Sequence, residues 1–491
     1  MTNDLADLAD LVERSTFFVG GAWNPPSGDE RVDVLEAATG APFGVAALAG
    51  TADVDAAVAA AGAALRGEWG RTTGTERAEA MRRLAAAMTS RAEDTAALVS
   101  RENGMPRPLS IGANGLAPPA MLDYYAGLAE ELDRDDVRSG ALARVHVRRE
   151  PVGVVAAVTP WNYPQALAAM KIAPALAAGC TVVLKPAPET ALDAYVWAEA
   201  ALEAGLPAGV LNVVPGGREA GAHLVAHPDV DKVAFTGSTA AGRAIGEVCG
   251  RLLRPVTLEL GGKSAALRAD DADLDAFLAA LPEVSLANNG QTCHACTRRV
   301  LAPRARYEEI VDAITDTVRS LPIGDPLDRR TRIGPVVSAA QRDRVLCHVD
   351  AGRAAGARLT TGGGVPERFD RGWFVEPTVF AGVDNDSVIA REEIFGPVLC
   401  VLPYDDTEDA IRIANDSEYG LGGTVWTTDP ERSRAIPDRI RSGTVGINHY
   451  ALDVLGPFGG VKASGLGREL GPEGLTPYVA LKSVYLTPET R

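Results

Sequence analysis

The chain of 491 residues is long enough for several cores, and its 46% hydrophobic and 23% charged residues are typical of a globular protein. The net charge of −17 excludes the basic surplus that nucleic-acid binding requires, so we expect no nucleic-acid partner. The acidic N-terminus does not resemble a signal peptide, and no apolar run approaches the ~20 residues of a membrane helix. Six scattered cysteines are too few for a disulfide framework. We therefore expect a cytoplasmic protein without membrane association.

Residues 50–100 are rich in alanine and carry apolar residues at helical spacing, which predicts helices. From residue 151, short β-rich runs alternate with helical segments, a pattern typical of a parallel, doubly wound sheet covered on both faces. Strands are expected at 152–160, 181–186, 209–216 and 232–237, and helices at 164–179, 190–205, 218–227 and 241–253.

A second series of strands and helices follows residues 257–270 and continues to about residue 460. Two β-rich runs, 143–153 and 478–486, belong to neither series. We interpret both as edge strands, which invite pairing with another chain.

Lysine is scarce, which makes each lysine worth testing for a role that arginine cannot fill. Of the 48 basic residues only six are lysines: Lys171, Lys185, Lys232, Lys263, Lys462 and Lys482.

Three short motifs permit more than one interpretation. In "KVAFTGSTAAGR" (232–243), Gly237 and Gly242 could bring helix N–H groups to a phosphate, or could belong to an ordinary strand-to-helix turn. "GGKS" (261–264) is not a P-loop, because Thr257 stands where that motif needs glycine, so a turn between two strands is expected. Glu259 lies between leucines, and either a general base or a structural ion pair would explain a buried carboxyl there.

The segment "NNGQTCHACTRR" (288–299) contains Cys293 and Cys296 in C-x-x-C spacing. A zinc site would need two further ligands at recognisable spacing, and a thioredoxin-like dithiol would begin a small βαβ domain. Neither condition holds, so we expect no metal. Glycine and polar amides before Cys293 favour a single activated thiol.

Seven collinear motifs together resemble the NAD(P)-dependent aldehyde dehydrogenase superfamily, from about residue 16 to the C-terminus. They are "PWNYP" (160–164), "LKPAPET" (184–190), "FTGSTAAG" (235–242), "LELGGK" (258–263), "GQTC" (290–293), "EEIFGPV" (392–398) and "PFGGVKASGLGRELG" (457–471). The resemblance implies an α/β protein with two doubly wound parallel-sheet domains and a small β oligomerisation arm.

It also implies domain boundaries. A dinucleotide-binding domain would comprise 1–136 and 153–261, a catalytic domain 262–462, and oligomerisation strands 137–152 and 475–491. The expected assembly is a homodimer or homotetramer.

Position by position, the resemblance makes Cys293 the nucleophile, Glu259 the base that activates the deacylating water, and Asn162 the donor to the oxyanion. The residues implied to bind the cofactor are Thr159, Pro160, Trp161, Lys185, Gly217, Gly237, Ser238, Leu260, Glu393 and Phe395.

The implied reaction oxidises an aldehyde to a carboxylic acid through a thiohemiacetal and a thioester on Cys293, with NAD(P) as oxidant. Glu259 favours hydrolysis over transfer to coenzyme A, because relatives that acylate coenzyme A commonly lack this glutamate. Many NAD-preferring relatives carry a glutamate three positions after Lys185, whereas this chain has Pro188 there and Glu189 next. We favour NAD, with NADP as the alternative.

The expected partner is a small-molecule aldehyde, namely a medium-sized, apolar aliphatic, terpenoid or aromatic one, because the implied pocket is apolar and aromatic with no arginine for a second carboxylate. The pocket residues are Tyr163, Leu167, Met170, Thr292, His294, His449, Tyr450 and Phe458. The alternatives are a semialdehyde dehydrogenase, a non-catalytic protein on the same fold, and a thiol–disulfide protein. Cys296 is interpreted as a packing neighbour, or else as the partner of Cys293 in a reversible disulfide.

Overall fold

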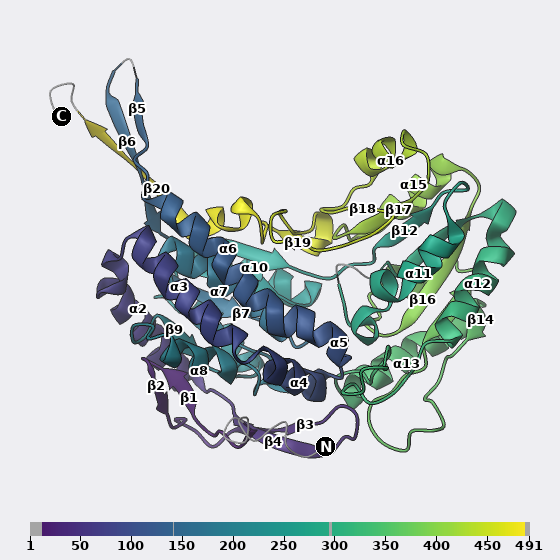
Figure 1. The fold of residues 1–491 in the computed structure, drawn as a ribbon, viewed down its shortest axis with the longest axis horizontal. Helices are drawn as coiled ribbons and strands as arrows, with labels where there is room; N and C mark the ends of the chain where they lie inside the picture. The colour runs from purple at the N-terminus through teal and green to yellow at the C-terminus, as the bar shows by residue number, and fades with distance from the viewer. Residues whose placement is uncertain (1–11, 141, 294–296, 487–491) are drawn as a thin grey trace.

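The computed structural model describes residues 12–140, 142–293 and 297–486, which form two large sheets, two small sheets and their covering helices (Figure 1). The first large sheet has eight strands in the order β19-β11-β10-β7-β8-β9-β1-β2. Its central strands, from β11 to β9, run parallel as predicted, and β19, β1 and β2 extend it antiparallel. The strands are β1 (Phe17–Val19), β2 (Ala22–Asn24), β7 (Val154–Val158), β8 (Thr181–Lys185), β9 (Leu211–Val213), β10 (Lys232–Thr236), β11 (Val256–Glu259) and β19 (Gly465–Leu466).

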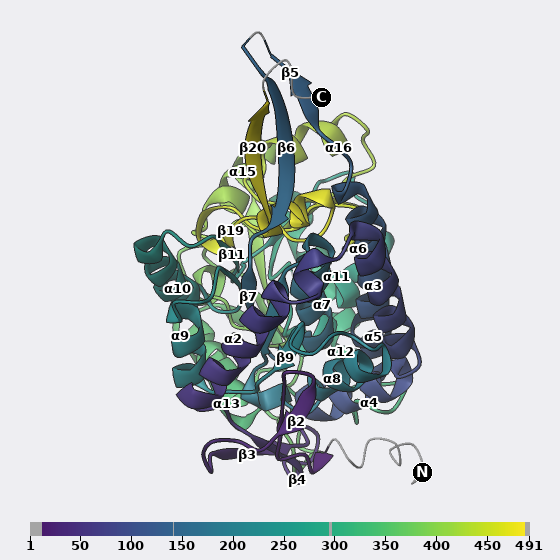
Figure 2. The same cartoon turned by 90° about the vertical axis from the view of Figure 1, so that its left-hand side faces the viewer.

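Side chains of the central strands alternate between the two faces of this sheet. Val155 and Ala157 of β7 pack into one apolar core, and Val154, Ala156 and Val158 into the core on the opposite face. Helices therefore cover both faces, with α2, α9 and α10 on one side and α3, α6 and α7 on the other (Figure 2). The helices of this half are α2 (Thr51–Arg66), α3 (Gly74–Thr89), α4 (Ala92–Asn103), α5 (Arg107–Ser110), α6 (Ala117–Leu132), α7 (Pro164–Ala178), α8 (Tyr195–Glu203), α9 (Arg218–Ala226) and α10 (Thr239–Leu252).

The second large sheet has seven strands in the order β14-β15-β16-β13-β12-β17-β18, all parallel except β14. Its two faces also bury separate cores. The strands are β12 (Ala265–Arg268), β13 (Arg299–Pro303), β14 (Arg358–Thr361), β15 (Thr378–Ala381), β16 (Val398–Tyr404), β17 (Gly423–Trp426) and β18 (Gly446–Ile447). The helices are α11 (Leu274–Ser285), α12 (Tyr307–Arg319), α13 (Ala339–Ala354), α14 (Val388–Arg391), α15 (Thr407–Asn415) and α16 (Arg432–Ala435).

A three-stranded arm of β5 (Val137–Ser139), β6 (Arg144–Pro151) and β20 (Val479–Leu486) projects from the body (Figures 1 and 2). The order β20-β6-β5 makes β6 the middle strand, so the prediction that 143–153 is an edge strand is wrong. It is wrong because β5, which the sequence pattern did not reveal, pairs with its free side. β20 is an edge, as predicted, and its side chain Tyr485 is 73% exposed. A small hairpin of β3 (Arg31–Leu35) and β4 (Pro42–Ala47) completes the sheets.

β19, at 465–466, follows residue 462, where the catalytic domain was expected to end, and pairs with β11 of the first sheet. One local expectation needs correction. The helix expected from 190 begins only at Tyr195. Before it, the N–H of Leu192 donates to Glu102 (2.9 Å) and Asp193 accepts from Gln165 (2.5 Å), contacts that hold the chain in turns. Across the described ranges, no helix is both long and apolar enough to cross a membrane.

Candidate active site

The catalytic candidates lie where the two large sheets meet. Asn162 follows β7, Glu259 ends β11, and Cys293 lies between α11 and β13. Carboxyl ends of parallel strands are where open α/β sheets bind their ligands. Asn162 and Cys293 line one cavity of about 320 Å³, and burial together with the nearby charges of Cys293 and Glu259 raises the pKa of Tyr450 to about 12. The structure thus brings the three residues into one neighbourhood.

Asn162 is 3% exposed, and its carboxamide is held in one orientation. Its Nδ2 donates to the backbone oxygen of Gln291, two residues before Cys293, at 3.0 Å. A carboxamide nitrogen carries two N–H donors. One donor fixes the side chain against the nucleophile segment, and the other is available for an oxygen bound in the cavity.

Glu259 is 2% exposed, and neither carboxyl oxygen has a hydrogen-bond partner among the described residues. Burial raises its pKa well above the usual range, and the nearby charge of Glu469 raises it further, while Lys171 opposes the rise. A Cβ on Gly459 would stand 2.6 Å from Glu259 Oε1, so the "PFGG" glycine makes room for this carboxyl. Because Glu259 has no salt bridge in the described part of the chain, the interpretation as a structural ion pair lacks support.

A buried ion pair lies behind Glu259, and sequence reasoning missed it. Lys171 Nζ of α7 is 2.8 Å from Glu469 Oε1 and donates to Thr236 Oγ1 at 2.6 Å. Both charged side chains are at most 1% exposed. Burying two charges is costly even when they pair, which makes this pair a candidate for function rather than stability. The one available signal was the scarcity of lysine.

The cavity walls include four of the eight predicted pocket residues: Tyr163, Leu167, Met170 and Tyr450. Thr292 lies behind Tyr163 and shares a 2.8 Å hydrogen bond with its hydroxyl. Phe458 is buried in the apolar core that Cys293 packs against, but it does not line the cavity. His449 is exposed and does not line the cavity either; it follows Asn448, whose φ of 51° places a local turn of the backbone there. His294 lies outside the described residues.

One wall of the cavity was not expected from the sequence. It comes from α5, α6 and the π-helical turn between them, Ile111–Leu116. Single π-helical turns of this kind occur frequently at functional sites. Small side chains dominate this wall, and the carboxylate of Glu283 from α11 stands at the exposed rim beside it. The wall residues are Leu109, Gly112, Ala113, Ala117 and Met121.

The predicted cofactor residues surround the carboxyl ends of β8 and β10. Lys185 ends β8, and burial lowers its pKa to about 8. Its Nζ donates to the backbone oxygens of Pro186 (2.8 Å) and Gly216 (2.5 Å). Gly217 and Ser238 are the N-caps of α9 and α10, and space is open beside Gly217. Helix N-termini with such space suit a phosphate group.

The small residues of the "FTGSTAAG" segment are required by close packing. A Cβ on Gly237 would lie 2.5 Å from the Phe235 ring, and one on Gly242 would lie 2.4 Å from Leu260. Gly237 N–H also donates to the backbone oxygen of Glu259 at 3.0 Å. This glycine turn therefore holds the base strand in place, which is the ordinary strand-to-helix role left open by the sequence.

The expected nicotinamide end is assembled from two loops. The rings of Trp161 and Phe395 meet edge to face, with their centroids 5.3 Å apart. Pro160 and Thr159 precede Trp161 in the chain, and the N–H of Thr159 donates to the Lys185 backbone oxygen (3.1 Å). Phe395 has a φ of 57°, which is uncommon for a bulky residue and points to a functional constraint. Glu393 Oε1 accepts from the N–H of Gly262 at 3.1 Å. Pro188 occupies the position where a ribose carboxylate was expected, and Glu189 is exposed beside it.

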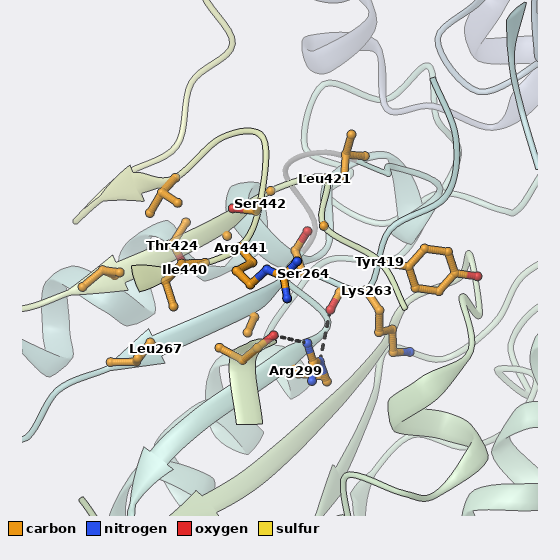
Figure 3. Close-up of a pocket in the computed structure, with 17 residues that line it drawn as sticks. Lys263, Ser264, Leu267, Arg299, Tyr419, Leu421, Thr424, Ile440, Arg441 and Ser442 are labelled. Atoms are coloured by element: carbon orange, nitrogen blue, oxygen red, sulfur yellow. Dashed lines mark hydrogen bonds between the residues drawn. The ribbon is translucent and has the colours of Figure 1, made fainter. Parts of the chain in front are cut away.

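"GGKS" connects β11 of the first large sheet to β12 of the second, so the expected turn between two strands is instead an irregular connection between the two sheets. Lys263 is 1% exposed and lines a small second cavity with Ser264, beside Arg299, whose Nε donates to the Lys263 backbone oxygen (Figure 3). That cavity holds about 20 Å³, room for little more than one water molecule. It is too small for a nucleotide, in agreement with the exclusion of a P-loop.

In the described part of the chain, no group of three or more His, Cys, Asp or Glu side chains could hold a metal ion. Cys296 lies outside the described residues, so its relation to Cys293 is not described.

A cysteine, a carboxamide and a buried carboxyl at the junction of two doubly wound sheets define a class of protein. The model of the aldehyde dehydrogenase family matches residues 23–484, and the chain belongs to this family. The predicted family, fold class and enzyme type are thereby confirmed.

Individual relatives match over nearly the full length. The chain is 54% identical to a geranial dehydrogenase of Castellaniella defragrans, covering 97% of this chain and 99% of the relative. It is 48% identical to an aldehyde dehydrogenase of Mycobacterium tuberculosis solved with NAD+, with a TM-score of 0.95 and coverage of 98% and 99%. A Pseudomonas syringae aldehyde dehydrogenase solved with NAD+ and octanal is 37% identical, with a TM-score of 0.92 and coverage of 97% of each chain.

Proposed function

We propose that this enzyme oxidises a neutral, apolar aldehyde to the carboxylic acid, with NAD as the hydride acceptor. The observation that carries the proposal is the shared cavity of Cys293 and Asn162, whose walls are mostly apolar. A nucleophile and an oxyanion donor face the same space, and that space suits a hydrocarbon chain.

The reaction begins when the thiolate of Cys293 attacks the aldehyde carbon and forms a thiohemiacetal. The second N–H of the Asn162 carboxamide and the backbone N–H of Cys293 donate to the resulting oxyanion. Removing one such donor typically lowers kcat by ~10²–10³. The nicotinamide, when bound, supplies the acceptor for the hydride that leaves the tetrahedral carbon, and a thioester remains on the sulfur.

Deacylation requires a base, and Glu259 fits this role. Its carboxyl is buried and its pKa is raised, which makes the ionised form a stronger base towards water. The activated water attacks the thioester, releases the carboxylic acid and restores the thiol. The pair of Lys171 and Glu469 modulates the charge on the base, since both groups act on its pKa.

Two observations favour NAD: the residues expected to bind the cofactor are in place, and similar enzymes have been solved with NAD+. Lys185 is positioned at the end of β8, and the N-caps Gly217 and Ser238 offer helix N-termini to phosphates. Relatives solved with NAD+ share 37% and 48% of the sequence. NADP is the alternative, because Pro188 leaves the ribose without the expected carboxylate.

The cavity favours an aliphatic or terpenoid aldehyde over a semialdehyde. Leu109, Met121, Leu167 and Met170 line it, and Glu283 at its rim would repel a second carboxylate. The geranial dehydrogenase of C. defragrans and the octanal bound to the P. syringae enzyme agree with this chemistry. Aromatic aldehydes fit the same apolar walls.

The arm supports a homodimer or homotetramer. Its edge strand β20 exposes Leu481 and Tyr485, at 69% and 73%, and unpaired strand edges invite another copy. Sedimentation velocity at several concentrations tests this assembly, and a monomer at all of them would refute it. We place the enzyme in the cytoplasm.

The test of function is the formation of reduced cofactor with a panel of aldehydes: geranial, octanal, benzaldehyde and succinic semialdehyde, each with NAD and with NADP. We expect the highest kcat/KM with NAD and geranial or octanal. No turnover with any aldehyde would refute the proposal. Cys293→Ala should abolish activity while Cys296→Ala retains it, and equal loss in both variants would favour the thiol–disulfide alternative.

A further inference from the structure

We propose that Asn103, at the end of helix α4, is a positioning residue that holds the oxyanion donor Asn162 at a fixed place relative to Cys293. This inference rests on the proposed function. Asn103 belongs to no catalytic motif, and α4 contributes no residue to the cavity walls.

Every polar atom of the Asn103 carboxamide is used. Its Nδ2 donates to the backbone oxygens of Trp161 (3.0 Å) and Asn162 (3.1 Å), and its Oδ1 accepts from the N–H of Met105 (2.9 Å). The side chain is fully buried. It therefore anchors the backbone of the oxyanion loop directly at the residue whose side chain is the donor.

The same helix end also holds the nucleophile segment. The last carbonyl groups of a helix have no partner within the helix. Here the backbone oxygen of Asn103 accepts from Gln291 Nε2 (3.2 Å), and the backbone oxygen of Gly104 accepts from Asn289 Nδ2 (2.8 Å). Gln291 and Asn289 lie two and four residues before Cys293. The end of α4 is thus tied to both loops of the reaction site.

A direct link between the two loops completes the arrangement. Asn288 Nδ2 donates to the backbone oxygen of Asn162 (2.8 Å), and Asn162 Nδ2 donates to the backbone oxygen of Gln291 (3.0 Å). Asn288 and Asn289 have φ values of 51° and 58°, in the left-handed region where asparagine is tolerated better than most residues. This buried carboxamide network joins loops from two different sheets, and Asn103 supplies its connection to the helical layer.

The consequence is geometric. An oxyanion donor acts only where the oxyanion will form, and misplacement by about 1 Å can cost about 10²-fold in rate. Replacing Asn103 by aspartate keeps its size but puts an acceptor opposite two carbonyl oxygens. The Asn162 loop should then move away from the position that the thiohemiacetal oxygen requires.

The experiment compares Asn103→Asp with Asn212→Asp. Asn212, in β9, is also fully buried, donates to two carbonyl oxygens (Val182, 3.2 Å; Gly209, 2.9 Å) and accepts one backbone N–H (Gly20, 2.9 Å). Each variant therefore removes two buried hydrogen bonds from a side-chain amide to backbone oxygens, but only Asn103→Asp removes them at the Asn162 loop. Stopped-flow measurement with octanal and NAD gives the amplitude and the rate constant of the first turnover.

We expect the first-turnover rate constant of Asn103→Asp to fall about 10- to 100-fold. A primary isotope effect with 1-deuterated octanal should accompany it, and Asn212→Asp should change only the amplitude. A rate constant within twofold of the wild type in Asn103→Asp, or an equal fall in Asn212→Asp, would overturn the inference. If Asn103→Asp does not fold, Asn103→Ser is measured by the same criteria. A wild-type enzyme without any turnover would instead refute the proposed function.

Discussion

The two sides of Cys293 are built on opposite principles. On one side lie the charged groups Glu259, Lys171 and Glu469, all at most 2% exposed. On the other side lies a mostly apolar cavity. Part of its wall carries no side chain larger than a methyl group, at Gly112, Ala113 and Ala117. The charged side acts on the reaction through the groups present there. The apolar side selects the aldehyde through the space left free.

This difference predicts different consequences of mutation. Removing Lys171 or Glu469 leaves its buried partner unpaired, which strongly perturbs the stability of the fold, and removing Glu259 takes away the base. Filling open space beside the cavity leaves the reacting groups in place and changes only which aldehydes reach them. Rates should therefore depend on the charged side and selectivity on the apolar side.

The largest effect should follow from Glu259→Gln. The amide keeps the shape but cannot take a proton from water, so the thioester should form normally and hydrolyse slowly. General base catalysis contributes about 10²–10⁴-fold, and steady-state kcat should fall by that factor while the first turnover persists. Stopped-flow detection of reduced cofactor separates the two phases. Normal steady turnover would show that another group is the base.

A smaller rate effect with a clear pH signature should follow from Lys171→Met. The positive charge of Lys171 lowers the raised pKa of Glu259, so its loss should raise that pKa further. Because the base acts only when ionised, the rise of kcat with pH should shift to higher pH, and activity at neutral pH should fall. The pH profile of kcat measures this.

The control for that variant is Lys232→Met. Lys232 is equally buried and donates to Thr257 Oγ1 at 2.8 Å, and after burial the largest influence on its pKa is the charge of Glu469, not that of the base. Its removal should destabilise the fold without a comparable shift of the profile. Equal shifts in both variants, or no shift with Lys171→Met, would contradict the assigned influence on Glu259.

The sequence predicted the charged side only in part. Glu259 and Cys293 stand in local motifs, and the cost of burying a carboxyl marked Glu259 without any structure. Lys171 and Glu469 are 298 positions apart and meet only because α7 packs beside the returning C-terminal segment. No local pattern encodes such a contact. The scarcity of lysine made Lys171 worth testing for a role, but did not indicate which partner it binds.

The apolar side was less predictable still. Residues 106–119, with their prolines and glycines, suggest a break between helices rather than a wall of a binding site. A π-helical turn has no characteristic sequence period, so its lining residues could not be read from spacing. The parallel strands, by contrast, are continuous apolar runs and were predicted well. Tertiary pairing decided the exceptions, β5 beside β6 and β19 beside β11.

Gly112→Val should change selectivity and leave the chemistry intact. A Cβ at Gly112 would meet no atom within 4 Å, and the φ of Gly112 lies outside the left-handed region, so a Cβ is accommodated there without backbone strain. It would occupy the space that a long or branched aldehyde needs. We expect kcat/KM for geranial to fall about 10-fold or more, within the range that single methyl groups produce in apolar pockets. Propanal should be little affected.

Gly127→Val in α6 is the matched control, since a Cβ there also meets no atom within 4 Å and the position is exposed away from the cavity. It should lower helix stability without altering the ratio of kcat/KM between geranial and propanal. An unchanged ratio in Gly112→Val would mean that substrates do not extend along the π-helical wall.

The smallest effect should come from Glu283→Gln at the rim. Because Glu283 is exposed, its charge acts through water and is screened by salt, so its influence on a bound substrate is weak. Removing it should raise kcat/KM for succinic semialdehyde about two- to fivefold at low ionic strength, through loss of repulsion, while octanal serves as the uncharged control. The gain should vanish at about 1 M salt, where the Debye length is about 3 Å. A gain that persists in high salt, or an equal gain with octanal, would mean that Glu283 acts by shape and that its charge does not select the substrate.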